Sequence, residues 1–141
     1  MIGLYVMKRI GIIGLILMLV LGLLALILSP TQKQKETEWD IKNAKAYVTQ
    51  IVKIPLVAYR IDTGDYPTTE EGFEALLQAP KSKTKLWKGP YIEEIPLDPW
   101  GNRYQYIYPG KMNEEGFDVF SFGQDGITSE DDITNWKKSK S

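Results

Sequence analysis

The chain has 141 residues, enough for one small domain and little more. Its 17 Lys and Arg against 18 Asp and Glu leave a net charge of −1, which argues against a nucleic-acid-binding protein, since those need a basic surface. It contains no Cys and no His, which excludes disulfides, thiolate nucleophiles and every His-dependent catalytic triad. We therefore expect a protein that is not an enzyme.

Residues 10–28 are the first distinctive segment, because none of these 19 residues carries a charge. As an α-helix they would span about 28 Å, close to the thickness of the hydrocarbon core of a bilayer. Lys8 and Arg9 precede the run, and basic flanks tend to stay in the cytoplasm. The pattern predicts a cytoplasmic start at 1–9 and a single transmembrane helix at 10–28. The rest of the chain would then lie outside the cytoplasmic (inner) membrane, in the periplasm or its equivalent.

A cleaved signal peptide is the alternative for this segment. Signal peptides have apolar stretches of about 7–15 residues that end at a small-x-small cleavage site. The run here is longer, and residues 25–30 (ALILSP) contain no such site. The length of the run and the missing cleavage site favour a retained anchor over a signal peptide. A polar linker at 29–37 follows the anchor.

A helical pattern follows from 38 to 61. Apolar residues recur there at spacings of three and four, namely Ile41, Ala44, Tyr47, Val48, Ile51, Ile54, Ala58 and Ile61. Pro55 lies inside the pattern and removes one helical hydrogen bond, which predicts a kink near residues 51–55. Gly64 lies in a turn that ends the helix.

The remaining elements are short. Thr68 and Glu71 form a T-x-x-E capping box for a second helix, which Pro80 ends. Residues 91–95 could form a brief strand, 98–101 have type I turn chemistry, and 103–108 and 117–122 alternate as two strands do. The order of elements predicts an α+β fold in which a long amphipathic helix packs on a small antiparallel sheet. This domain would occupy 38–136, with a tail at 137–141.

Acidic residues crowd the segment after the second of these strands. Asp125, Glu130, Asp131 and Asp132 lie within eight residues, and such like charges repel unless a cation lies among them. Calcium binds six to eight oxygens from carboxylates and carbonyls, and Gly123 and Gly126 would let the backbone turn its carbonyls inward. From composition alone, both a calcium loop and a solvated acidic turn remain open.

Three motifs give the chain a resemblance to a known family. YPTTEEG at 66–72, DPWGNRYQY at 98–106 and FDVFSFGQDG…DDITNW within 117–136 occur in this order. Together they resemble the extracytoplasmic domain of the major pseudopilin, the G subunit, of type II secretion systems. The resemblance covers roughly residues 45–136. It implies a structural protein with a long helix on a small sheet, the arrangement predicted above from the pattern of elements.

The resemblance also implies a structural Ca²⁺ in the last loop. Side-chain ligands would be Asp125 and Asp131, with Asp132 beside them, and carbonyl ligands would come from Phe122, Ile127 and Ser129. The resemblance further implies three kinds of partner. They are the membrane, other pseudopilins or inner-membrane secretion components, and further copies of the chain.

The N-terminus departs from the family pattern. Lys8, Arg9 and Gly11 imitate the family's leader, but cleavage after Gly11 would leave Ile16 at the fifth position, where the family has Glu. That carboxylate pairs with a neighbouring subunit inside the membrane, and this sequence has no Glu before Glu36. The sequence therefore leaves two functions open, namely a pseudopilin-like subunit of a type II secretion or type IV pilus-like system, and a stand-alone, membrane-tethered, calcium-binding interaction module.

Overall fold

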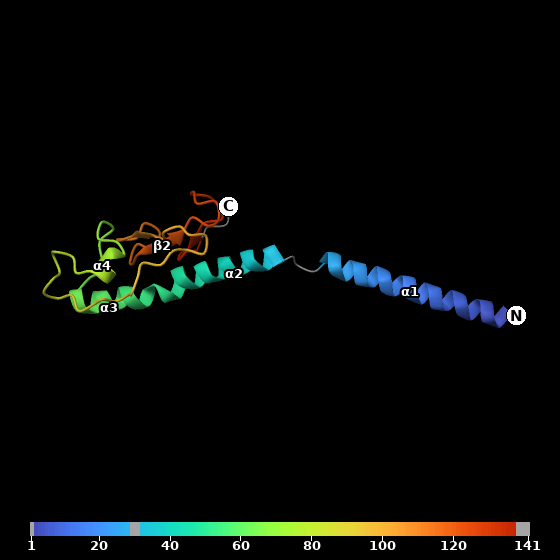
Figure 1. The fold of residues 1–141 in the computed structure, drawn as a ribbon. Helices are drawn as coiled ribbons and strands as arrows, with labels where there is room; N and C mark the ends of the chain where they lie inside the picture. The colour runs from blue at the N-terminus through green and yellow to red at the C-terminus, as the bar shows by residue number, and fades with distance from the viewer. Residues whose placement is uncertain (1, 29–31, 138–141) are drawn as a thin grey trace. The chain divides into compact units, whose positions relative to one another are not determined.

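A computed structural model of the chain describes residues 2–28 and 32–137, with side chains for 14–27 and 33–137 (Figure 1). The chain divides into two compact units, Met1–Glu36 and Thr37–Ser141. Helix α1 (Ile2–Leu28) belongs to the first unit, and the side chains of residues 14–27 are all exposed. Among the residues searched, which are the described ones, no helix is both long and apolar enough to cross a membrane. Some predicted segments lie wholly or partly outside the described residues. They are the side chains of the predicted start at 1–9, parts of the predicted span and linker, and residues 138–141 of the predicted tail.

From Thr37 on, three consecutive helical segments form one side of the second unit. They are α2 (Gln32–Ala46), the π-helical segment η1 (Tyr47–Ile51) and α3 (Lys53–Thr63). The helix begins at Gln32 rather than at 38, so residues 32–37, predicted as linker, are helical. Gln, Lys and Glu dominate this stretch, and all three have high helix propensity. The helix ends at Gly64, whose φ of 90° few other residues tolerate and whose N–H donates to the Arg60 carbonyl.

Pro55 explains the π-helical segment, which lies just before the predicted site of distortion at 51–55. In η1 the Val52 N–H donates to the carbonyl of Tyr47, five residues earlier. Regular α-helix then resumes at Lys53, which places Pro55 in the first turn of α3. N–H groups in a first turn have no acceptor within their own helix, so the missing N–H of proline costs little there.

The π-helical segment η1 also changes which face of the helix is buried. The fully buried helical side chains are Ala44, Val48, Val52, Leu56 and Tyr59. Ile51, Ile54 and Ile61, which the predicted stripe placed inside, are 52%, 74% and 76% exposed. Ile41, which precedes η1, is also exposed, at 47%. The prediction is therefore wrong at Ile41 and over the second half of the stripe, where the five-residue π turn inserts one extra residue and shifts the buried face by one position.

A three-stranded antiparallel sheet packs against this helix. Its strands are β1 (Gln105–Ile107), β2 (Asp118–Ser121) and β3 (Ile133–Thr134), in the order β1-β2-β3. Tyr106 pairs with Val119, and Ser121 pairs with Ile133. The predicted α+β class and two of the strands are confirmed. Strand β3 was not predicted, and residues 91–95 form no strand.

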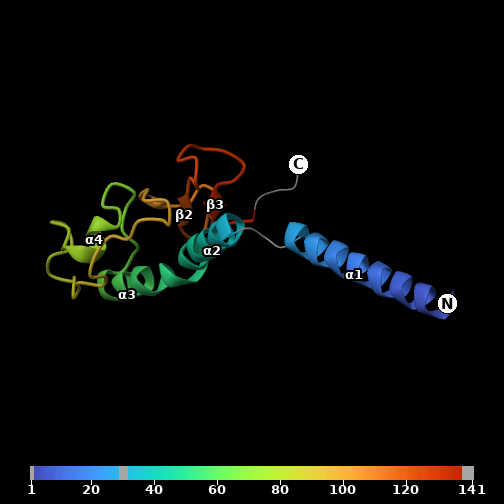
Figure 2. The same cartoon turned by 45° about the vertical axis from the view of Figure 1, so that its right-hand side comes forward.

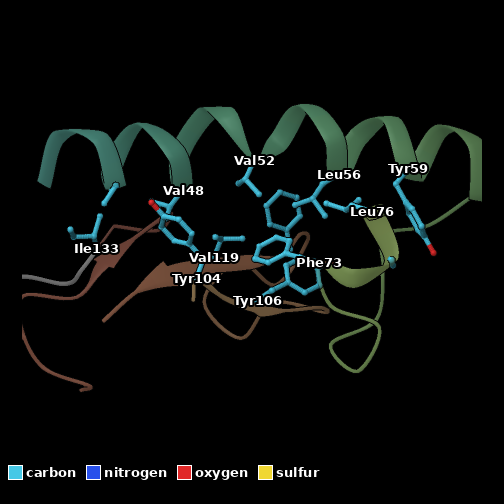
Figure 3. Close-up of a cluster of buried hydrophobic side chains, with 13 residues drawn as sticks. Val48, Val52, Leu56, Tyr59, Phe73, Leu76, Tyr104, Tyr106, Val119 and Ile133 are labelled. Carbon is cyan, nitrogen blue, oxygen red and sulfur yellow. The ribbon is translucent and has the colours of Figure 1, made fainter. Parts of the chain in front are cut away.

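The core lies between the helix and the sheet. Figure 3 shows Val48 and Val52 on the helix facing Tyr104 and Val119 from the sheet side, and Leu56 beside Phe73 and Leu76. The ring of Tyr47 stacks on that of Tyr104 at a centroid distance of 4.2 Å. Burial, with a smaller effect of the Asp98 carboxylate, raises the pKa of Tyr104 to about 12, so its phenol stays neutral at physiological pH.

The short helix α4 (Glu74–Leu77) closes one end of the core with Leu76. The predicted capping box forms, but it closes the turn at 69–73 rather than the helix, which begins only at Glu74 with Phe73 as its N-cap. The Glu71 N–H donates to Thr68 Oγ1 at 3.2 Å, and the Thr68 N–H donates to Glu71 Oε2 at 3.1 Å. These reciprocal bonds fix the chain where it leaves the long helix and turns toward the sheet.

Candidate functional site

All six predicted ligand residues lie in one loop, residues 122–132, which connects β2 to β3 and extends beyond these strands (Figure 2). The pairing of Ser121 with Ile133 closes the base of the loop. On the outer face of the sheet, the ring of Phe120 contacts Phe122 edge-on at 5.4 Å and Trp136 at 5.5 Å. Both ends of the loop are therefore held on the same strand.

The carboxylates of this loop bond to its own backbone and hydroxyl groups. Asp125 Oδ1 accepts the Ile127 N–H at 3.1 Å, and Asp132 Oδ1 accepts the Ser129 N–H at 3.0 Å. The Ser129 hydroxyl donates to Asp131 Oδ1. Asp125, Asp131 and Ile127 are exposed, while Phe122, Ser129 and Asp132 are half-buried. The loop is thus folded on itself, with most of its acidic oxygens facing solvent.

Two glycines give this loop its shape. Gly123 and Gly126 have φ values of 71° and 70°, in the left-handed region that favours glycine. A Cβ on Gly123 would lie 3.1 Å from Asp131 Oδ2, so the Asp131 carboxylate lies directly over the Gly123 backbone. The sequence predicted this role of the glycines from the G-Q-D-G pattern.

Backbone oxygens are essential to any cation site in this loop. Within the part of the chain that the structure describes, no three acidic side chains gather closely enough to hold a metal ion by themselves. The loop nevertheless combines carboxylates with backbone carbonyls freed from strand pairing, an all-oxygen donor set that suits a hard cation such as Ca²⁺. The residues present therefore fit the predicted ion in their chemistry, provided that carbonyls supply part of the shell.

Sequence reasoning missed the support beneath the loop. Asp98 is only 4% exposed, and its Oδ2 accepts the Ser121 hydroxyl at 2.6 Å. Its Oδ1 accepts the N–H groups of Trp100 at 3.1 Å and Asn102 at 2.8 Å. The hydroxyl oxygen of Ser121 in turn accepts the Gly123 N–H at 2.9 Å. The predicted type I turn is confirmed by the bond from the Gly101 N–H to the Asp98 carbonyl, but the sequence did not indicate that this turn contacts the acidic loop.

Asp118 is a second buried carboxylate that sequence reasoning missed. It is 1% exposed, and it accepts the backbone N–H groups of Lys111, Met112 and Asn113 at 2.7–2.9 Å. The Asn113 side-chain amide bonds to both Asp118 and Asn135. This network orders the connection between β1 and β2. The sequence carried no clear signal of this burial, because Asp118 alternates with Val119 along β2 and so lies on the face of the strand that points away from the helix.

Comparisons with known proteins agree with the motifs. A family model described as "Type II secretion system (T2SS), protein G" matches residues 31–136. The type II secretion system core protein G of Klebsiella pneumoniae is 35% identical over 128 residues, which cover 86% of this chain and 88% of that protein. The protein of the same name from Escherichia coli (strain K12) is 36% identical over 132 residues, covering 89% and 88%.

The fold gives the same result. The crystal structure of the major pseudopilin from the type 2 secretion system of enterohaemorrhagic Escherichia coli matches with a TM-score of 0.65 and 33% sequence identity, covering 77% of this chain and 92% of that one. The family is a structural, non-enzymatic component of the secretion system, so the expectation that the chain is not an enzyme is confirmed. On its sequence and on its fold, the chain belongs to the type II secretion system protein G family.

Proposed function

We propose that this chain is a structural, membrane-anchored pseudopilin subunit that acts with other pseudopilins or with inner-membrane components of a type II secretion system. The observation that carries the proposal is the family match over residues 31–136 together with the pseudopilin-like head. The core of that head is filled by large apolar side chains from the helix and the sheet.

Helix α1 is the anchor in this proposal. Its side chains from 14 to 27 are apolar or glycine, and all of them are exposed to the surroundings. A helix that is apolar on every side needs an apolar environment, either a protein core or a bilayer. The uncharged run in the sequence continues to both sides of this segment, over 10–28. A single span, with Lys8 and Arg9 in the cytoplasm and the head outside the inner membrane, accommodates all of these features.

A structural Ca²⁺ in loop 122–132 completes the proposal. Side-chain oxygens of Asp125 and Asp131 bind it, Asp132 lies beside them, and the carbonyls of Phe122, Ile127 and Ser129 supply further ligands. The all-oxygen composition of the loop and its two left-handed glycines support this assignment. The bound ion offsets the repulsion among the carboxylates and holds the loop in one conformation.

A stand-alone, membrane-tethered binding module is the second candidate. The specific observation in its favour is the absence of any Glu before Glu36, since Ile16 occupies the position where the family has its pairing carboxylate. Without that carboxylate, subunits lose one attraction for the N-terminus of a neighbour within the membrane. Assembly would then depend on contacts between heads and on apolar packing of α1.

Cross-linking in cells that carry the secretion genes tests the proposal. We expect treatment with an amine-reactive reagent to give a ladder of bands at multiples of 16.1 kDa, because lysines lie along the exposed sides of the head. The bands should stay in the membrane pellet after washing with alkaline carbonate, which removes proteins that are not inserted in the bilayer.

The two parts of this experiment fail independently. A chain released by carbonate would contradict the anchor, whatever the pattern of bands. A membrane-bound chain that gives one monomer band would contradict the pseudopilin subunit and favour the stand-alone module. The control is the same reaction in cells that lack the other secretion genes. Any band that contains this chain cross-linked to another secretion component should be absent there.

A further inference from the structure

We propose that Asp98 and Ser121 are positioning residues for calcium, which orient the carbonyl group of Phe122 toward the candidate ion site. This inference rests on the calcium loop proposed above and adds two residues outside that loop. Neither residue touches the ion in this proposal. Both act on the peptide bond that joins Phe122 to Gly123.

The geometry of one peptide group carries the first step. The Gly123 N–H donates to Ser121 Oγ at 2.9 Å, and this bond is buried. The Phe122–Gly123 peptide is trans, since the only cis peptides in the described chain precede Pro90 and Pro109. In a planar trans peptide the C=O and the N–H point in opposite directions. The bond that draws the N–H toward the core therefore turns the Phe122 carbonyl away from Ser121, toward the loop side.

The second step is that Ser121 cannot rotate. Its side chain is fully buried, and its hydroxyl proton is donated to Asp98 Oδ2 at 2.6 Å. This leaves the lone pairs of the hydroxyl oxygen free to accept the Gly123 N–H. A short bond to a carboxylate is among the stronger hydrogen bonds in proteins. Asp98 therefore fixes both the position of Ser121 Oγ and the direction of its proton.

The third step is that Asp98 itself is held by the turn at 98–102. Its other oxygen accepts two backbone N–H groups of that turn, from Trp100 and Asn102. The same turn reaches the loop directly, because the Asn102 side-chain amide lies 3.5 Å from the Gly123 carbonyl and a Cβ on Gly126 would lie 3.7 Å from that amide. The DPWGN motif thus forms a rigid platform under the first half of the loop.

Such a platform matters because the loop's carboxylates alone do not form a site. An ion that depends on carbonyl ligands gains affinity when those carbonyls already point the right way before it binds. If the Gly123 N–H were released, the Phe122–Gly123 peptide could rotate and the free loop would sample many orientations. Calcium binding would then be weaker, because it would include the loss of conformational entropy on ordering the loop.

Calorimetric titration of Ca²⁺ into the chelator-stripped full chain in detergent tests the inference. Ser121→Ala removes the acceptor for the Gly123 N–H, and we expect it to weaken calcium binding about tenfold, the effect of losing one buried hydrogen bond. The matched control is Tyr106→Phe, which removes a buried hydroxyl that donates to the Pro67 carbonyl at 2.8 Å, away from the loop. The control should lower the melting temperature in chelator but leave the calcium affinity unchanged.

Asp98→Asn serves as a second variant in case Ser121→Ala does not fold. It keeps the shape of the side chain but loses the oxygen that accepts the Ser121 hydroxyl, so calcium affinity should fall severalfold. Glu115→Gln removes the same charge from an exposed position and should have no such effect. Calcium affinities equal to wild type in Ser121→Ala or in a folded Asp98→Asn would overturn the positioning role while leaving the calcium loop intact. A wild-type chain that binds no Ca²⁺ would overturn both proposals.

Discussion

Replacing Asp118 with alanine is expected to lower the free energy of unfolding of the head by about 4 kcal/mol. The carboxylate is buried, and it is the acceptor for the backbone N–H groups of Lys111, Met112 and Asn113. Without it these partly buried donors lose their partner, and each unpaired donor that is shielded from water is costly. Urea unfolding of the full chain in detergent, followed by tryptophan fluorescence, measures the change.

Two further variants control this prediction. Asp118→Asn retains one oxygen and the shape of the side chain, so its loss should be about half as large. Glu115→Ala removes an exposed acidic group from the same connection and should change stability by less than about 0.5 kcal/mol. A loss below about 1 kcal/mol in Asp118→Ala would show that solvent reaches these donors, contrary to the buried network.

A pair of substitutions on one helix gives the second large effect. Leu56→Ala should destabilise the head by about 3 kcal/mol, because Leu56 is fully buried and its removal leaves a cavity beside Phe73 and Leu76. Ile54→Ala, two residues earlier, should cost less than about 0.5 kcal/mol, because Ile54 is 74% exposed. Both values come from the same urea experiment.

These two positions distinguish the π-helical register from a regular helix. The sequence pattern placed Ile54 in the core, and an uninterrupted α-helix would bury it. Equal losses at both positions, or a larger loss at Ile54, would contradict the shifted register. A large loss at Leu56 alone would confirm that η1 rotates the buried face by one residue.

The parts of the fold that could be predicted are those set by local chemistry. The capping box depends on Thr68 and Glu71, which are three residues apart, and its two bonds form as expected. The turn at 98–101 depends on the order Asp, Pro, Trp, Gly. The strands β1 and β2 follow from alternation along each segment. In each case the residues that decide the structure are neighbours in the sequence.

The parts that could not be predicted depend on distant partners. Ile133 and Thr134 form a strand only because β2 offers them an edge to pair with, and two residues are too few to show a pattern. Residues 91–95 had a plausible strand pattern but no partner strand. The shift of the helical face arises from the way Val52 bonds to Tyr47 upstream of Pro55, which a fixed period of 3.6 cannot represent.

The candidate site also has a part that local sequence predicts and a part that depends on distant residues. The acidic loop was evident, because its carboxylates and glycines lie within a few residues of one another. The Asp98–Ser121 contact was not, because 23 residues separate the two side chains and each has an ordinary local explanation. Asp98 was assigned to a turn and Ser121 to a strand, and only the fold brings them together beneath Gly123.

Thermal unfolding of the full chain in detergent, with calcium and with chelator, tests most directly the claim that a cation locks the closing loop of the head. With calcium at about 100 times its dissociation constant, we expect chelation to lower the melting temperature by about 10 °C. Asp125→Ala should abolish this difference, and Glu115→Ala, which removes an exposed charge outside the loop, should retain it. A wild-type melting temperature that is the same in calcium and in chelator would contradict the claim.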